Sequence, residues 1–116
     1  MSAFGTILLQ FSFFILHFSF SFPDGTLKEI GKLMQGNPSL KLYVVGHTDN
    51  QGAVDMNMDL SRRRAQAVLT ALTTKYAVPA ARLRAFGNGP YAPVASNDTE
   101  EGRQENRRTE VRIISE

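Results

Sequence analysis

The most regular hydrophobic pattern of the chain begins at residues 40–46, where every second residue from Leu40 to Val44 is aliphatic. Alternation with a period of two predicts a strand that turns one face toward a core. Gly46 ends the alternation, and a polar loop over residues 47–52 follows. The inward face of this strand is expected to carry Leu40, Leu42 and Val44, with Tyr43 and Val45 on the other face.

A helix after this loop is predicted by apolar residues that recur three and four positions apart. It should begin between Asp55 and Asp59 and end near Tyr76. Its buried face is expected to consist of Leu60, Ala65, Val68, Leu69 and Leu72, and its polar face of Arg62, Arg63 and Gln66. Arg64 falls at the edge of the apolar stripe. Because long helical side chains lean toward the helix N-terminus, Arg64 should lean toward the preceding loop.

The remaining patterns predict shorter elements on either side of this unit. Thr26-Leu27-Lys28-Glu29 fits a capping box, in which a Thr hydroxyl and a Glu carboxylate satisfy free amides at a helix start. This helix would end at Gly36, before Asn37-Pro38. The elements expected further along are a strand over 82–87, a turn over 88–90, an irregular loop over 90–97, a short helix from 99 to about 107 capped by Asn97 or Thr99, and a last strand over 109–114 with Val111 and Ile113 inward.

Elements in this order predict an α/β sandwich. Helices would pack on one face of a small mixed sheet in βαβαβ order, with a short extra helix before the last strand. A chain of 116 residues is long enough for one domain with a modest two-layer core.

Residues 1–23 differ in composition from the rest of the chain. They contain no Asp, Glu, Lys or Arg, and they hold seven of the eight phenylalanines. Residues 17–22 alternate Phe with Ser, which predicts a strand, whereas residues 4–16 fit either a strand with an extra segment or a membrane-type helix. A cleaved signal is disfavoured, because a positive start and a small-residue cleavage site are missing. We therefore divide the chain into an atypical hydrophobic segment, 1–16, and a domain, 17–116.

Charge and composition narrow the classes of function. A formal net charge of +2 gives no general affinity for polyanions, and no aromatic residues interleave with Arg62-Arg63-Arg64, so no nucleic-acid partner is expected. The chain has no cysteine, which excludes disulfides and a thiol nucleophile. Its two histidines, His17 and His47, are too few for a typical zinc site. We expect no catalytic residue, no metal and no cofactor.

Asp49 and Arg64 are the sharpest pair of candidate site residues. A carboxylate after the end of a strand and a guanidinium on the first turns of the next helix can face one pocket. Such a site suits a ligand that carries one positive and one negative group. From residue types alone, an internal salt bridge that joins the loop to the helix is the alternative.

Two separated motifs in the chain resemble the signature of OmpA-like peptidoglycan-binding domains. The first motif is GHTDNQG at 46–52, followed by Asn57, Leu60-Ser61 and Arg64-Ala65. The second is NDTEEGR at 97–103, followed by Asn106-Arg107-Arg108. With its spacings intact, the resemblance covers roughly Thr26 to Ile114.

The resemblance implies a role for the first motif. In this family the residues that match Asp49 and Arg64 hold the diaminopimelate of the peptidoglycan stem peptide. An Asp can accept hydrogen bonds from its ammonium, and an Arg offers its carboxylate a planar two-pronged donor. Thr48 and Asn57 also fall on motif positions, where each either contacts the ligand or fixes the loop.

The second motif supplies Asn106 and Arg107 as further candidate ligand-binding residues. Because neighbouring side chains point in different directions, one of Arg107 and Arg108 is expected to face the site and the other the solvent. The structural alternative is pairing of these arginines with Glu100, Glu101 or Glu105.

By resemblance, the chain is a non-enzymatic module that anchors an outer-membrane or envelope protein to the cell wall without covalent chemistry. The expected location is the periplasm or outer membrane of a Gram-negative bacterium. The stem peptide would be its partner, and membrane association would come through the parent protein or the N-terminal segment.

The chain departs from the family before the first helix. The family usually has a loop with Phe, an acid and a small residue there, whereas this chain passes from Phe22-Pro23-Asp24-Gly25 almost directly into the helix. One wall of the pocket is therefore expected to be altered. The alternative function is a structural or assembly module of the same fold that has lost ligand binding and acts as a homodimer.

Overall fold

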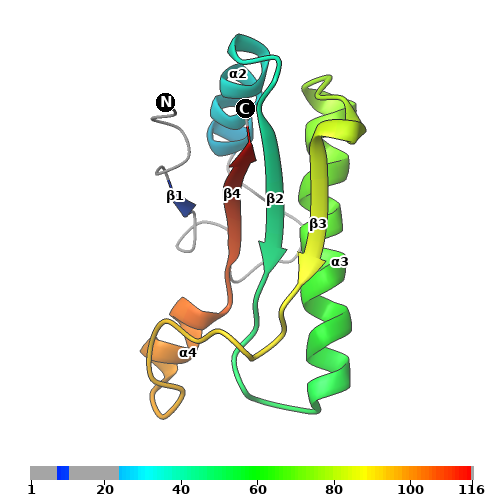
Figure 1. The fold of residues 1–116 in the computed structure, drawn as a ribbon. Coiled ribbons are helices and arrows are strands. Elements are labelled where there is room, and N and C mark those ends of the chain that lie inside the picture. The colour runs from blue at the N-terminus through cyan, green and yellow to red at the C-terminus, as the bar shows by residue number, and fades with distance from the viewer. Residues whose placement is uncertain (1–7, 11–23, 116) are drawn as a thin grey trace.

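The structure is a computed structural model that describes residues 8–10 and 24–115. Within these residues, four strands and three α-helices follow one another in a largely alternating order (Figure 1). They are β1 (Leu8–Gln10), α2 (Asp24–Gly36), β2 (Lys41–Gly46), α3 (Val54–Lys75), β3 (Leu83–Gly87) after a short 3-10 turn (Ala80–Arg82), α4 (Glu100–Asn106) and β4 (Thr109–Ser115).

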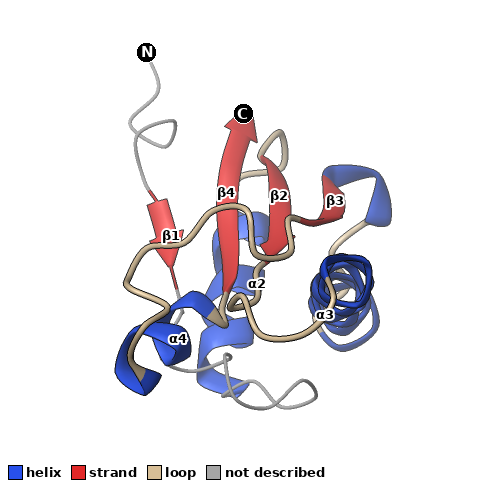
Figure 2. Ribbon diagram, turned by 90° about the horizontal axis from the view of Figure 1, so that it is seen from below, coloured by secondary structure: helices blue, strands red, loops and turns tan. Residues whose placement is uncertain are grey.

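The strands form one mixed sheet in the order β1-β4-β2-β3. β2 and β3 run parallel, and β4 is antiparallel to both β1 and β2. Helices α2 and α3 lie on one face of this sheet, and α4 lies at the end where β4 begins (Figures 1 and 2). This arrangement confirms the predicted sandwich with helices on one face.

The core lies between the sheet and the two long helices. Strand β2 contributes Leu42 and Val44, which alternate with exposed or half-buried neighbours as predicted. Apolar side chains of α2 and α3 meet them at helical spacing. The buried core consists of Leu27, Ile30, Met34, Leu40, Leu42, Val44, Ala65, Val68, Leu72, Val78, Leu83 and Val111.

The buried face of α3 differs from the prediction at one turn. Leu60 is only half-buried, and its neighbour Ser61 is fully buried instead. The reason is that Ser61 lies where the helix approaches the carboxyl ends of β2 and β3, a contact too close for a large side chain. The predicted polar positions Arg62, Arg63 and Gln66 are exposed.

Glycines on both strands make this close approach possible. A Cβ on Gly46 would collide with the carbonyl oxygen of Ser61, and one on Gly87 would collide with the backbone nitrogen of Arg62. The Ser61 hydroxyl donates to the Met58 carbonyl at 2.9 Å and accepts from the Gly89 amide at 2.9 Å. Ser61 thereby fastens the helix to the loop after β3.

The first long helix begins earlier than predicted. Asp24 and Gly25 already have helical backbone, so Thr26 lies inside the first turn of α2 and not at its cap. The predicted capping box at 26–29 is therefore wrong. The short helix α4 begins as predicted, because the Thr99 hydroxyl accepts a hydrogen bond from the Gly102 amide at 3.0 Å.

The N-terminal predictions are only partly covered by the described residues. Residues 17–22, the predicted strand, lie outside them. Of the alternatives left open for residues 4–16, Leu8–Gln10 is a strand, which pairs antiparallel with β4. No helix among the described residues is both long and apolar enough to cross a membrane.

The close approach of α3 to β2 predicts opposite effects for two glycine substitutions. Gly46→Ala should lower the free energy of unfolding by about 3 kcal/mol or more, because the added methyl overpacks against helix backbone. Gly36→Ala is the matched control. Its Cβ would meet nothing within 4 Å, so stability should change by less than about 1 kcal/mol, toward greater stability. Urea unfolding measures both, and equal losses would contradict the contact.

Candidate ligand site at the carboxyl end of β2

The polar loop after β2 is held on both sides by backbone hydrogen bonds. The His47 amide donates to the Arg108 carbonyl at 2.8 Å, and the Thr48 amide donates to the Gly89 carbonyl at 2.8 Å. The loop therefore lies between the start of β4 and the loop after β3. It brings the two sequence motifs together in space.

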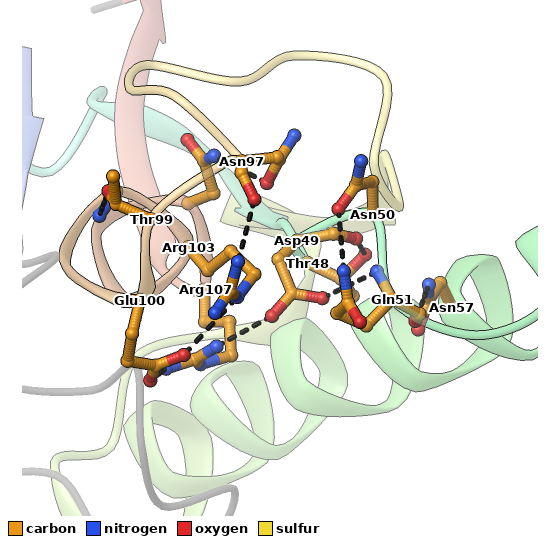
Figure 3. A network of polar contacts seen from close by, with 12 residues as sticks. Thr48, Asp49, Asn50, Gln51, Asn57, Asn97, Thr99, Glu100, Arg103 and Arg107 are labelled. Atoms are coloured by element: carbon orange, nitrogen blue, oxygen red, sulfur yellow. Dashed lines mark hydrogen bonds and ion pairs between the residues drawn. The ribbon is translucent and has the colours of Figure 1, made fainter.

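Asp49 lies at the centre of the polar site (Figure 3). Its side chain is 9% exposed. Oδ1 accepts a hydrogen bond from the Gln51 amide at 2.9 Å, and Oδ2 forms an ion pair with Nη1 of Arg107 at 2.6 Å. The carboxylate is thus fixed by its own loop and by the second motif.

Arg107 bridges Asp49 and an acid on α4. Its Nη2 lies 2.7 Å from Oε2 of Glu100. Burial works to lower the pKa of Arg107, but its hydrogen bonds to Glu100 and Asp49 outweigh burial and raise it. Glu100 also pairs with Arg103 at 3.2 Å, and Nη1 of Arg103 donates to the Asn97 carbonyl at 2.8 Å. These contacts tie α4 and the preceding loop to the site.

Arg64 is a cation beside this network. It is half-buried, and within the part of the chain that the structure describes its buried Nε has no hydrogen-bond partner. Burial lowers the pKa of Arg64, the nearby charge of Arg107 lowers it further, and only Asp49 raises it. Among the described residues Asp49 forms its ion pair with Arg107, and it acts on Arg64 through its nearby charge. The site is left with an excess of positive charge.

Thr48 and Asn57 hold the loop that carries Asp49. The Thr48 hydroxyl donates to the Asp49 carbonyl at 2.7 Å, and Nδ2 of Asn57 donates to the Gln51 carbonyl at 2.8 Å. Asn57 lies in the first turns of α3, so it also joins the loop to the helix. Both residues thus fix the loop, and direct contact with a ligand stays a prediction.

Asn106 is fully buried and holds the loop before α4. Its Oδ1 accepts from the amides of Val94 at 2.7 Å and Ala95 at 3.0 Å. Its Nδ2 donates to the Ala95 carbonyl at 3.0 Å and to Oδ1 of Asn97 at 2.9 Å. Both donors and both acceptor positions of the amide are therefore used within the protein. Its predicted contact with a ligand stays untested.

The burial of Arg108 contradicts the expectation that one of these two adjacent arginines faces the solvent. Arg107 faces the site, but Arg108 is only 3% exposed. The alternation along β4 places Arg108 on the sheet face away from α2 and α3, where the loop before α4 covers it. Its Nη2 donates to the Ala92 carbonyl at 2.9 Å, and its Nε pairs with Oε2 of Glu110 at 2.8 Å.

Glu110 and His47 complete this second buried polar cluster. Nε2 of His47 lies 3.4 Å from Oε1 of Glu110, a long contact that still brings the ring close to the carboxylate. The contact with His47 and the ion pair with Arg108 hold the pKa of Glu110 far below its ordinary value. Sequence reasoning missed this cluster. Its one signal was an acid between arginines in the last strand, Arg108-Thr109-Glu110-Val111-Arg112.

A metal centre has no support in the described residues, because no three His, Cys, Asp or Glu side chains gather where they could hold an ion. What the site offers is a fixed carboxylate, Asp49, with guanidinium groups around it. This chemistry suits non-covalent binding of a charged ligand.

The fold and the paired motifs define a domain of the OmpA type. The chain belongs to the OmpA family, whose model matches residues 22–107. It is 42% identical over 88 residues to the probable lipoprotein YiaD of Escherichia coli, covering 76% of this chain and 40% of YiaD. It is also 42% identical over 90 residues to outer membrane porin F of Pseudomonas aeruginosa, covering 78% of this chain and 26% of the porin.

A solved structure matches the fold. The peptidoglycan-associated lipoprotein of Burkholderia pseudomallei superposes with a TM-score of 0.79 at 25% identity, covering 92% of this chain and 89% of that one. These findings confirm the family that the two motifs indicated. An outer-membrane porin and lipoproteins among the relatives agree with the predicted envelope location. The chain spans less than half the length of YiaD and of the porin.

The buried ion pair of Glu110 predicts a pH-dependent loss of stability. A carboxyl whose pKa is lowered by folding stabilises the fold above its unfolded pKa, near 4.5, and loses that contribution as the pH falls through its folded pKa. Glu110→Gln should therefore cost about 3 kcal/mol at pH 7, because it leaves Arg108 buried and unpaired. The difference from the unsubstituted protein should shrink steadily below pH 4.5.

Urea unfolding at pH 7 and at lower pH measures this difference. Glu101→Gln, on an exposed acid, is the control and should stay within about 0.5 kcal/mol at every pH. A Glu110→Gln cost that does not change between pH 7 and pH 3 would show that ionised Glu110 does not stabilise the fold.

Proposed function

We propose that this domain binds peptidoglycan by holding the diaminopimelate of the stem peptide between Asp49 and Arg64, and so anchors its parent protein to the cell wall. The observation that carries the proposal is the half-buried Arg64, whose Nε has no hydrogen-bond partner among the described residues although it lies in the field of Asp49. The family and the peptidoglycan-associated relative support the same assignment.

The chemistry of diaminopimelate matches the charges of the site. The far end of this residue carries an ammonium and a carboxylate on one carbon. Each Asp49 oxygen accepts one hydrogen bond within the protein and retains a further acceptor position, so the ammonium can bind without displacing Arg107. The carboxylate of diaminopimelate then binds to Arg64, whose planar guanidinium donates hydrogen bonds to both carboxylate oxygens.

Binding would also relieve an electrostatic cost at Arg64. Burial and the neighbouring charge of Arg107 both disfavour its charged form. A bound carboxylate supplies the negative charge that the cluster lacks. Arg107 contributes in two ways: it holds Asp49 in place, and it adds to the positive potential that attracts the carboxylate.

The other motif residues act as positioning residues in this proposal. Thr48 and Asn57 shape the Asp49 loop, and Asn106 shapes the loop before α4. The described domain makes the contact with the wall. Membrane association comes through the parent protein or the hydrophobic segment over residues 1–16.

Co-sedimentation with insoluble peptidoglycan that contains diaminopimelate tests the proposal. Asp49→Asn and Arg64→Ala should each weaken binding by about tenfold to a hundredfold, since a charged hydrogen bond contributes about 1.5–3 kcal/mol. Arg63→Ala is the matched control, because Arg63 lies next along the helix but is exposed and pairs with Asp59. It should bind like the unsubstituted protein. Arg64→Lys should recover only part of the loss.

Two further measurements test which group of the ligand is bound and whether the domain binds the wall at all. Amidation of the diaminopimelate carboxylate should weaken the unsubstituted protein more than it weakens Arg64→Ala. If Asp49→Asn and Arg64→Ala fold and still sediment like the unsubstituted protein, the pair does not bind the wall. If the unsubstituted protein does not sediment at all but forms dimers in analytical ultracentrifugation, it is an assembly module.

A further inference from the structure

The sheet face away from α2 and α3 carries an exposed aromatic pair. Figure 1 shows the strands in front of these helices, so this open face points toward the viewer. Tyr43 on β2 and Phe86 on β3 are 37% and 44% exposed. Their ring centroids are 5.1 Å apart with an interplanar angle of 86°. Two exposed rings in contact, on β2 and the edge strand β3, are available to a partner.

Arginines flank Tyr43 of the aromatic pair on both sides. Strand pairing aligns Arg112 of β4, Tyr43 of β2 and Arg84 of β3 in one row across the open face. Both arginines are exposed. Glu110 is the one acid that these three strands place on this face among the described residues; it is buried, and it pairs with Arg108 at 2.8 Å and with Nε of Arg112 at 3.3 Å, so one carboxylate faces two guanidinium groups there. The exposed charge of the face is therefore positive.

A pocket continues this face toward the loop before α4. Its volume is about 560 Å³. Val45, Pro93 and Val94 give it an apolar side, whereas Arg108, Glu110 and Arg112 line its polar side. The open face thus joins an aromatic surface, a pocket with one apolar side and the exposed side chains of two arginines.

We propose that this open face docks an extended acidic peptide segment of a partner protein. An aliphatic side chain of the peptide enters the pocket beside Val45 and Val94. Its neighbouring carboxylates pair with Arg84 and Arg112, and its backbone packs on the rings of Tyr43 and Phe86. This surface is distinct from the Asp49 site, which faces Arg64 on α3, so the inference does not depend on the proposed function.

The geometry favours a peptide over other partners. Bases or sugar rings that stack in succession need aromatic faces presented side by side, but the two rings meet edge to face. A second copy of the chain in a symmetric dimer would bring the same basic surface onto itself, and the arginines would repel. An acidic segment with an aliphatic residue matches both the positive charge of the face and the apolar side of the pocket.

Selection of random twelve-residue peptides, displayed on phage, against the full chain tests the inference. Enriched peptides should contain Asp or Glu next to an aliphatic residue. Binding of the best peptide, measured by fluorescence anisotropy, should weaken at least tenfold in the Arg84→Glu/Arg112→Glu protein and in Phe86→Ala, and it should weaken with salt. The matched control, Lys28→Glu/Arg63→Glu, makes the same charge change with exposed residues of the helices and should bind within twofold.

Several outcomes would overturn the inference. Enriched peptides without acidic residues would do so, as would equal binding to the Arg84→Glu/Arg112→Glu protein and its control. Loss of peptide binding in Asp49→Asn would place the peptide at the other site. Dimers that dissociate in Arg84→Glu/Arg112→Glu would make a second copy the occupant. Unchanged sedimentation of Arg84→Glu/Arg112→Glu with peptidoglycan is expected, because the two surfaces are separate.

Discussion

The close packing of α3 on the carboxyl ends of β2 and β3 is the constraint on which the rest of this structure depends. Gly46 and Gly87 leave no room for a side chain, and Ser61 fills the contact with a small hydroxyl that bonds to the next loop. This contact fixes the distance between the end of β2 and the first turns of α3. Asp49 follows the strand and Arg64 follows Ser61, so one backbone contact determines where both charges of the site lie.

The ion pair of Asp49 with Arg107 adds the second motif to this frame. It joins residues 58 positions apart, and through Glu100 it reaches α4. The result is a rigid carboxylate among more guanidinium groups than it can neutralise. Arg64 is a half-buried excess cation whose Nε has no hydrogen-bond partner within residues 8–10 and 24–115, which suits a site that binds an anion. The neighbouring carboxylate allows that anion to carry an ammonium as well.

The sequence predicted what local patterns determine. The period of two gave β2, the helical period gave α3, and the two motifs identified the family and the loops that meet. It did not predict features that depend on distant packing. Ser61 replaces Leu60 at the helix contact because of glycines on two other strands, and Arg108 is buried because residues 92–94 fold over it. The choice of Arg107 over Arg64 as partner of Asp49 depends on how α4 is placed, which residue types alone do not determine.

The central claim is that Arg64 receives the ligand's carboxylate, and its Nε–H signal in a ¹H–¹⁵N NMR titration tests this most directly. On addition of a muropeptide that contains diaminopimelate, the Arg64 Nε–H resonance should shift and saturate with the affinity of the domain. The Nε–H resonance of Arg63, which already donates to Asp59 at 2.8 Å, should not move. Binding of the muropeptide with no change at Arg64 would contradict the account.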